Sequence, residues 1–139
     1  MRIRGHHLLC LLGFQGLGYS PEFIRRMEKT RKALEKGPLF SIKTVEECDD
    51  ICSACPYCQG GECKKGKFSA TRTRETDRKI LKALGLRKGQ VIRSSRVIPL
   101  IREKLGRFPQ LVKICGRCGW REACTYYVDL RTAWRSKSI

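Results

Sequence analysis

The sequence predicts a single, mainly helical α+β domain that is organised by cysteine-bound metal. Apolar residues recur at helical spacing between good helix ends, and one stretch alternates as a short strand does. Nine cysteines among 139 residues are far more than an ordinary domain contains. This length suits one domain, 1–139, with a modest hydrophobic core. The 41% of hydrophobic residues predicts a folded globule.

Two helices are expected near the N-terminus. Residues 6–14 are apolar nearly all round, which predicts a buried helix. The next helix begins with Ser20 as its N-cap and Pro21 at its first position. Gly37 and Pro38 end it.

The remaining elements are shorter and are separated by a cysteine-rich loop. Residues 46–66 are rich in cysteine, glycine and acids, so we expect metal to organise them with little regular structure. The other expected elements are a strand at 39–45, a helix at 75–84, a short strand at 91–92, a helix that Ser94 or Ser95 caps and Gly106 ends, a lead-in segment at 109–114, a last helix at 120–134 and a frayed tail at 135–139.

The positive charge is concentrated in the middle of the chain. The formal net charge is +17, with 30 basic and 13 acidic side chains. Residues 64–107 hold 15 of the basic and 3 of the acidic ones, a net +12. Such a segment indicates a polyanionic partner, or else a solvated basic surface. Phe68 is its only aromatic residue, so nucleic acid would be bound there mainly through phosphates.

Nothing in the sequence predicts a membrane anchor or a secretion signal. No apolar run approaches the roughly 20 residues that cross a bilayer. The apolar stretch Leu8–Phe14 is short, and no small-residue cleavage site follows it. We therefore expect a cytoplasmic protein, in which disulfides are disfavoured. The odd number of cysteines and their two-residue gaps also favour metal over disulfides.

The first group of cysteines has the spacing of a metal site. Cys52, Cys55 and Cys58 are separated by two residues each, as at the start of a bacterial ferredoxin run. Cys63 comes one residue later than that pattern expects, and Gly60-Gly61 lets the chain turn back to bring it in. The same spacing serves zinc, so it predicts a metal without choosing which one.

The second group resembles a rubredoxin or zinc-ribbon knuckle. Cys115 and Cys118 are separated by two residues, and Gly119 after them tolerates positive φ and lets backbone N–H groups point at the sulfurs. Cys124 lies within reach, which leaves one coordination position open. It is filled by Cys10, His7, His6, a cysteine of the first group, or a substrate.

Two histidines and a cysteine at the N-terminus have two readings. His6 and His7 precede Cys10 by four and three residues, so either can share a helix face with it. In the first reading these residues bind a metal or donate a proton beside a metal centre. In the second, Cys10 is a small buried hydrophobic residue and backbone groups form the hydrogen bonds of both histidines. Asp49 and Asp50 are expected to cap the loop rather than support a metal.

The chain resembles a known family at three blocks. These are RGHHLLCLLGFQGLGYSPEF (Arg4 to Phe23), DDICSACP (Asp49 to Pro56) and CGRCGW with the following cysteine (Cys115 to Cys124). They resemble domain of unknown function 1284 of bacteria and archaea, which is thought to bind an iron–sulfur cluster. The resemblance implies functional roles for Cys10, Cys52, Cys55, Cys63, Cys115, Cys118 and Cys124. Cys48 and Cys58 would be extra ligands or spares.

The sequence thus favours a non-enzymatic iron–sulfur protein of 4Fe–4S type, with an electron-transfer, structural or regulatory role. A redox partner would follow from the first of these roles. Cys52, Cys55, Cys58 and Cys63 would hold one site, and Cys115, Cys118 and Cys124, with Cys10, the other. One alternative is a zinc-stabilised module that binds RNA or DNA through Lys64–Arg107. Another is an enzyme with an open coordination position near His6 and His7.

Overall fold

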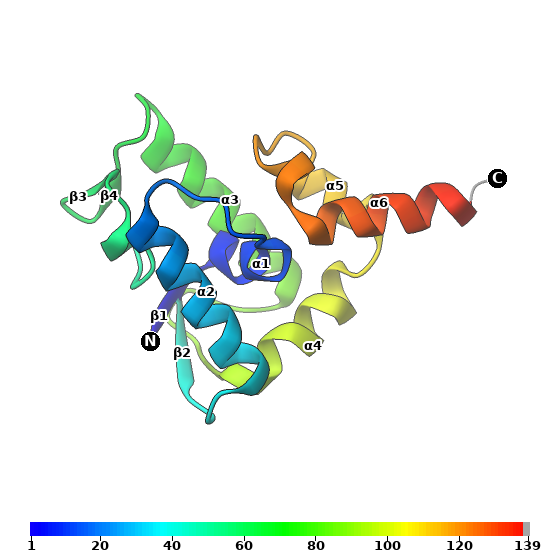
Figure 1. The fold of residues 1–139 in the computed structure, drawn as a ribbon, viewed down its shortest axis with the longest axis horizontal. Helices are drawn as coiled ribbons and strands as arrows, with labels where there is room; N and C mark the ends of the chain where they lie inside the picture. Colours follow the sequence, from blue (N-terminus) through cyan, green and yellow to red (C-terminus); the bar gives the residue numbers. More distant parts are fainter. Residues whose placement is uncertain (138–139) are drawn as a thin grey trace.

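A short buried helix, α1 (Gly5–Gly13), stands at the centre of a mostly helical fold (Figure 1). The computed structural model describes residues 1–137. Helices α2, α3, α4 and α6 all contact α1, and α5 packs against α6. The helices are α2 (Pro21–Lys36), α3 (Ser69–Leu84), α4 (Ser94–Leu105), α5 (Phe108–Cys115) and α6 (Thr125–Lys137), with 3₁₀ turns η1 (Cys52–Ala54) and η2 (Arg121–Ala123). The prediction of a mainly helical α+β domain is confirmed.

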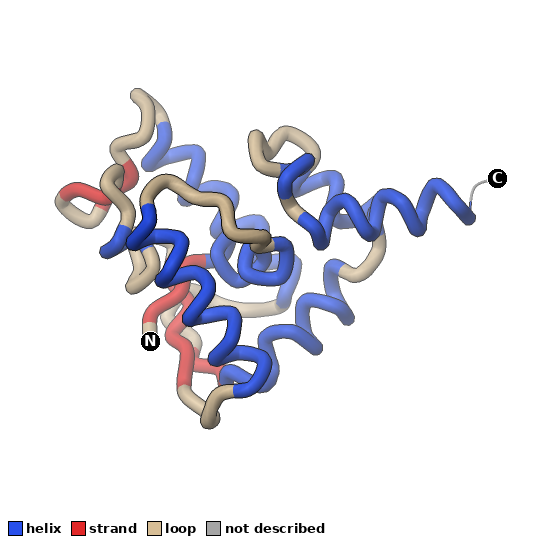
Figure 2. The backbone as a smooth tube through the Cα atoms, viewed as in Figure 1, coloured by secondary structure: helices blue, strands red, loops and turns tan. Residues whose placement is uncertain are grey.

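A three-stranded sheet lies at one end of the molecule (Figure 2). The strands are β1 (Arg2–Arg4), β2 (Ser41–Val45) and β5 (Val91–Arg93), with β2 in the middle. β1 runs parallel to β2, and β5 runs antiparallel to it. The two strands expected in this region are confirmed, whereas the three-residue β1 was missed because it is too short to show an alternating pattern.

The first cysteine-rich loop contains a small hairpin of β3 (Cys58–Gln59) and β4 (Glu62–Cys63). Gly60 and Gly61 form its two-residue turn with φ of +59° and +78°. Both values are positive, which L side chains adopt only with strain and glycine adopts freely. The turn places Cys58 directly opposite Cys63, so the predicted return of Cys63 is confirmed.

The ends of α2 follow the predicted capping pattern. The backbone N–H of Phe23 donates a 3.1 Å hydrogen bond to Ser20 Oγ. Pro21 holds the first helical position, and the Gly37 N–H donates to the Ala33 carbonyl. These contacts satisfy backbone groups that would otherwise lack partners at the helix ends.

Three later expectations are corrected. The helix expected at 75–84 begins earlier, at Ser69, because polar residues on its first two turns hide the periodicity. The segment expected to lead into the second cysteine group is itself a helix, α5. The last helix begins at Thr125 rather than 120, and it continues through Lys137 where a frayed tail was expected. Residues 138–139 of that tail lie outside the described residues.

The prediction that Ser94 or Ser95 caps α4 is wrong. Ser94 is the first residue of the helix, which has no side-chain cap. Its Oγ accepts a 3.1 Å hydrogen bond from the Phe40 N–H, and its own N–H donates to the Phe40 carbonyl at 2.8 Å. Ser94 therefore ties α4 to the segment that precedes β2.

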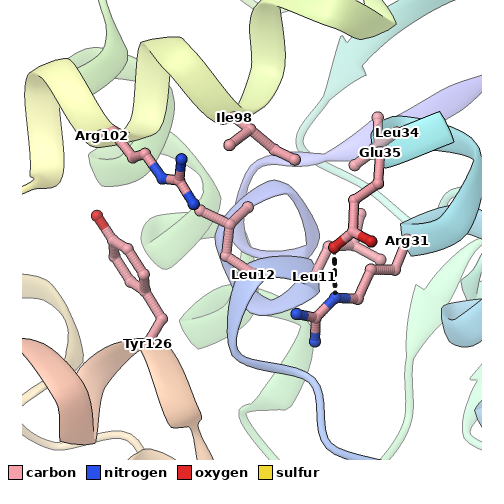
Figure 3. Close-up of a pocket in the computed structure, with 8 residues that line it drawn as sticks. All are labelled: Leu11, Leu12, Arg31, Leu34, Glu35, Ile98, Arg102 and Tyr126. Atoms are coloured by element: carbon pink, nitrogen blue, oxygen red, sulfur yellow. Dashed lines mark hydrogen bonds and ion pairs between the residues drawn. The ribbon is translucent and has the colours of Figure 1, made fainter.

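One hydrophobic core fills the space between the sheet and the helices. Leu8 and Leu11 of α1 are fully buried in it, as the all-round apolar pattern of this helix predicts. A small cavity of about 70 Å³ remains between α1, α2, α4 and α6, with the Arg31–Glu35 ion pair at its wall (Figure 3). No cysteine lines it. Within residues 1–137, no helix combines the length and apolar character needed to cross a bilayer.

Candidate metal centres

Four cysteines from distant parts of the chain lie near one another between α1, α5 and the loop before α6. Cys10 comes from α1, Cys115 ends α5, and Cys118 and Cys124 lie in the following loop. Burial raises the pKa of Cys10 well above its usual value, and the charges of Cys118, Cys124 and Cys115 raise it further. We call these four residues the second cluster.

Backbone N–H groups point at the sulfurs of the second cluster. The Trp120 N–H donates to Cys118 Sγ at 3.4 Å. The backbone N–H groups of Tyr127 and Tyr126 oppose the effect of burial on the pKa of Cys124. Gly119 does not use the positive φ that glycine tolerates, so the turn at Cys118 forms without a left-handed residue after it.

The sulfurs of the second cluster are electrostatically crowded. Burial, followed by the charges of Cys118 and Cys124, raises the pKa of Cys115 to about 12. Burial is also the main reason that the pKa of Cys124 is raised. Such thiols ionise together only when a cation balances their charge, and metal binding supplies that balance by displacing the protons.

The first cluster comprises Cys48, Cys52, Cys55, Cys58 and Cys63. Burial, followed by the nearby Cys58, raises the pKa of Cys48 to about 12. Cys55 is close enough to Cys63 and Cys58 for their charges to raise its pKa, although burial raises it most. The Cys58 N–H donates to the Cys55 carbonyl at 3.2 Å, and the Tyr57 and Cys58 backbone groups oppose the effect of burial on the pKa of Cys55. All nine cysteines of the chain are free thiols.

Arg4 places a buried positive charge beside the first cluster. Its Nη1 lies 3.6 Å from Cys52 Sγ and 4.0 Å from Cys48 Sγ. Its Nη2 forms a 2.8 Å ion pair with Asp77, and the two side chains are 4% and 0% exposed. Burial opposes the charge, but Asp77 and Cys52 more than compensate and raise the pKa of Arg4. A fixed cation at this position favours ionised sulfur.

The Asp49 side chain forms hydrogen bonds with β1, α1 and η1 at the first cluster. Its Oδ1 accepts the Cys52 N–H at 2.8 Å, and its Oδ2 accepts the Arg4 N–H at 2.7 Å. The same Oδ2 lies 2.8 Å from His7 Nδ1. Although burial opposes it, His7 and these backbone N–H groups lower the pKa of Asp49. Asp49 is therefore both the predicted cap, at η1, and the partner that orients His7.

His7, Asp49 and Cys52 form a buried group whose ligand atoms all lie within 4.8 Å of one another. Asp49 already accepts hydrogen bonds through both of its oxygens. A carboxylate bound to one imidazole nitrogen leaves the other nitrogen to face a metal, which is a common arrangement around metal-binding histidines. The group thus has the chemistry of a metal site, with Asp49 orienting His7.

His6 is held by the carboxylate of Asp77. The Asp77 Oδ1 accepts the His6 N–H at 2.9 Å and lies 2.7 Å from His6 Nδ1. Burial, together with the charge of His7, lowers the pKa of His6 to about 4. Neutral His6 therefore donates Nδ1–H to Asp77, and Arg4 is the cation that pairs with this carboxylate. The reading in which the backbone satisfies the histidines is wrong, because carboxylates satisfy both.

Within residues 1–137, the group whose ligand atoms all lie within 4.8 Å of one another is His7, Asp49 and Cys52, so the two four-cysteine sites stay predictions. Of the residues offered for the fourth position of the second cluster, Cys10 lies near enough to Cys115, Cys118 and Cys124 for their charges to add to the effect of burial on its pKa, whereas His7 lies beside Asp49 and Cys52. Sequence reasoning missed Arg4 and Asp77. One signal for Asp77 was available: it is one of only three acids in the basic segment 64–107. Nothing comparable marks Arg4 among the chain's 30 basic residues.

The chain matches one protein family over most of its length. The family is described as "Protein of unknown function (DUF1284)", and the match covers residues 18–124. It contains eight of the cysteines, and Cys10, His6 and His7 precede it. Neither a curated protein nor a solved structure matches the chain. With two thiol clusters joined through a buried helix, this cysteine-rich chain belongs to the DUF1284 family.

Proposed function

We propose that this chain is an iron–sulfur protein with two cysteine-held centres and an electron-transfer, structural or regulatory role. Cys10, Cys115, Cys118 and Cys124 would hold one centre. Cys52, Cys55, Cys58 and Cys63 would hold the other. The observation that carries the proposal is the position of Cys10 on α1, more than 100 residues before Cys115 in the chain. The turn of α1 that follows Cys10 packs against Cys124 Sγ through Gly13, and the charges of Cys118, Cys124 and Cys115 act on Cys10.

The donor sets fit such a group. Cysteine thiolates are the usual ligands of 4Fe–4S clusters, and each proposed centre has four cysteines. Backbone N–H groups already aim at Cys118, Cys124 and Cys55, where they would stabilise negative charge on sulfur. When bound, a cluster of this kind supplies reversible one-electron transfer. Arg4 would add a positive charge beside the first centre and favour its reduced form.

Helix α1 connects the two proposed centres. His7 lies in the buried group with Cys52, and Cys10, three residues later, lies in the second cluster. Because α1 is also the middle of the hydrophobic core, loss of metal from either centre would loosen the packing of the whole domain. This arrangement supports a structural role alongside any electron transfer to a redox partner.

Zinc is the alternative occupant, since four thiolates also suit a structural zinc site. An absorption spectrum of anaerobically purified protein, with iron, sulfide and zinc analysis, separates the two. The proposal predicts a broad absorbance at about 400 nm that dithionite bleaches, with iron and sulfide in equal amounts. A colourless protein with stoichiometric zinc and no sulfide would overturn it.

A further inference from the structure

Three aromatic rings from separate segments meet beside the two cysteine clusters. Tyr19, in the loop before α2, lies between Tyr57 and Trp120. Its ring centroid is 5.5 Å from that of Tyr57 and 5.6 Å from that of Trp120, and both contacts are edge-to-face at 88°. Tyr57 belongs to the first cysteine loop, and Trp120 to the second. The rings therefore form one group only in the folded chain.

Lysine side chains border these rings. Lys65 Nζ donates a 2.8 Å hydrogen bond to the Tyr19 hydroxyl and lies 4.6 Å from the ring centroid. Trp120 Nε1 donates to the same hydroxyl at 3.0 Å, which fixes the Trp120 ring. Lys67 Nζ lies 5.5 Å from the centroid of Phe68, the residue that leads into α3. The group thus continues along the loop between β4 and α3.

The outer rings of this group are accessible to solvent. Phe68 is 58% exposed, Tyr57 39% and Trp120 37%. The sequence placed Phe68 alone in the basic segment, which argued against base stacking there. The fold adds Tyr57, Tyr19 and Trp120 from outside the segment, so base stacking would not depend on Phe68 alone.

Positive charge beside these rings is largely unpaired. Of the eight basic side chains from Lys64 to Lys82, only Lys64 and Arg78 form ion pairs within residues 1–137, with Glu62 and Glu46. Arg72, on the first turn of α3, is exposed. In Figure 1 the start of α3 lies near the β3–β4 hairpin, which it contacts through β4, so the positive charge of this turn lies beside the first cysteine-rich loop.

We propose that Tyr57, Phe68 and Trp120, with Lys65, Lys67 and Arg72, form a binding surface for single-stranded nucleic acid. We call these six residues the aromatic–basic surface. Unpaired bases stack on exposed rings, and the adjoining ammonium and guanidinium groups contact phosphates. In a duplex the bases are already stacked on one another, so only its phosphates would reach the surface. The surface therefore selects single strands.

Fluorescence anisotropy with a labelled single-stranded RNA of about 12 nucleotides tests this inference, since one such surface spans roughly 4–16 nucleotides. Purified protein with its native metal is used at about 50 and 200 mM salt, where phosphate contacts weaken steeply. Phe68→Ala and Trp120→Ala are each expected to weaken binding about 5- to 100-fold. Lys65→Gln should weaken it and lower the salt slope by about one.

Two variants separate stacking from folding. Trp134 on α6 is 42% exposed, and the C-terminal end of α6 points away from the β3–β4 hairpin in Figure 1. Trp134→Ala is the matched control and should leave affinity unchanged. Trp120→Phe keeps a ring and loses the hydrogen bond to Tyr19, so it should restore most of the affinity that Trp120→Ala loses.

The inference fails if no RNA binds at the lower salt concentration. It also fails if a duplex of equal length binds as tightly and the ring variants bind like wild type, because phosphate attraction alone would then explain the affinity. Metal content is measured on every variant. Loss of affinity in Phe68→Ala with full metal content supports the surface independently of which metal the chain holds.

Discussion

Gly13 and Cys124 pack so closely that no side chain fits between them. A Cβ on Gly13 would overlap Cys124 Sγ, and it would lie 3.2 Å from Cys124 Cβ and 3.3 Å from the Tyr126 nitrogen. Gly13 ends α1, one turn after Cys10. The close approach therefore sets the position of the Cys124 sulfur relative to the Cys10 sulfur.

Gly13→Ala should displace the Cys124 sulfur and empty the second centre. We expect iron per chain to fall to about half of the wild-type value, because the first centre is untouched. Gly119→Ala is the matched control, since a Cβ there meets nothing within 4 Å and no positive φ is involved. Full iron content in Gly13→Ala, or equal loss in Gly119→Ala, would contradict the proposed geometry.

Arg4→Met should strongly destabilise the fold. It removes the partner of a carboxylate that is 0% exposed and leaves Asp77 with a buried charge. Removing one member of a buried ion pair costs about 3–5 kcal/mol. Urea unfolding, followed by circular dichroism, measures the change in the free energy of unfolding.

Arg2→Met is the control for this prediction. Arg2 pairs with Glu47 at 3.1 Å, but the side chains are 46% and 33% exposed. Such a pair contributes about 0–1 kcal/mol, so the variant should unfold nearly as wild type does. Equal effects of the two substitutions would show that burial of the Arg4–Asp77 pair does not matter for stability.

The elements that were predicted correctly are those that depend on residues close together in the sequence. The Ser20 cap, the buried α1 and the Gly60-Gly61 turn each depend on neighbouring residues, and each is confirmed. The beginning of α3 was missed because its first turns carry polar residues that a loop also favours. The role of Ser94 was missed because its partner, Phe40, is 54 residues away.

Residue types and spacing predict two sets of cysteine ligands, which stay a prediction, and they did not predict the residues that surround these cysteines. The contacts of Arg4 with Asp77 and Cys52 join residues 73 and 48 positions apart. The contact of His7 with Asp49 spans 42 positions. No local periodicity encodes such pairs, because tertiary packing alone brings them together.

Acid should destabilise the chain through His6 and Asp77. Burial lowers the pKa of His6 from 6.5 to about 4, so between these values the unfolded chain binds a proton that the folded chain does not. Despite burial, His6 and Arg4 lower the pKa of Asp77 from 3.8. Both groups therefore contribute stability that is present at neutral pH and is lost as the pH falls.

The thermal midpoint, measured between pH 7 and pH 4, tests this pH dependence. His6→Gln removes one of the two titrating groups, so its midpoint should fall less steeply than that of wild type over this range. A wild-type midpoint that rises toward pH 4, or an unchanged slope in His6→Gln, would contradict the assignment.

Cys55 and Cys48 should respond differently to substitution. The backbone groups of Tyr57 and Cys58 favour the thiolate of Cys55, as suits a ligand, and Cys48 is the buried fifth cysteine beside Cys52 and Cys58. Cys55→Ala should lose the iron of the first centre, whereas Cys48→Ala should keep it. Elemental analysis of the two purified variants measures their iron content. Iron loss in Cys48→Ala but not in Cys55→Ala would show that Cys48, not Cys55, is the ligand.

The stoichiometry of iron and sulfide tests the central claim most directly. Wild-type protein and Cys10→Ser are purified side by side without oxygen, and iron, acid-labile sulfide and zinc are counted per chain. Two 4Fe–4S centres predict about eight iron and eight sulfide in wild type, and about four of each in Cys10→Ser. Zinc without sulfide in the wild type, or full iron in Cys10→Ser, would contradict the account.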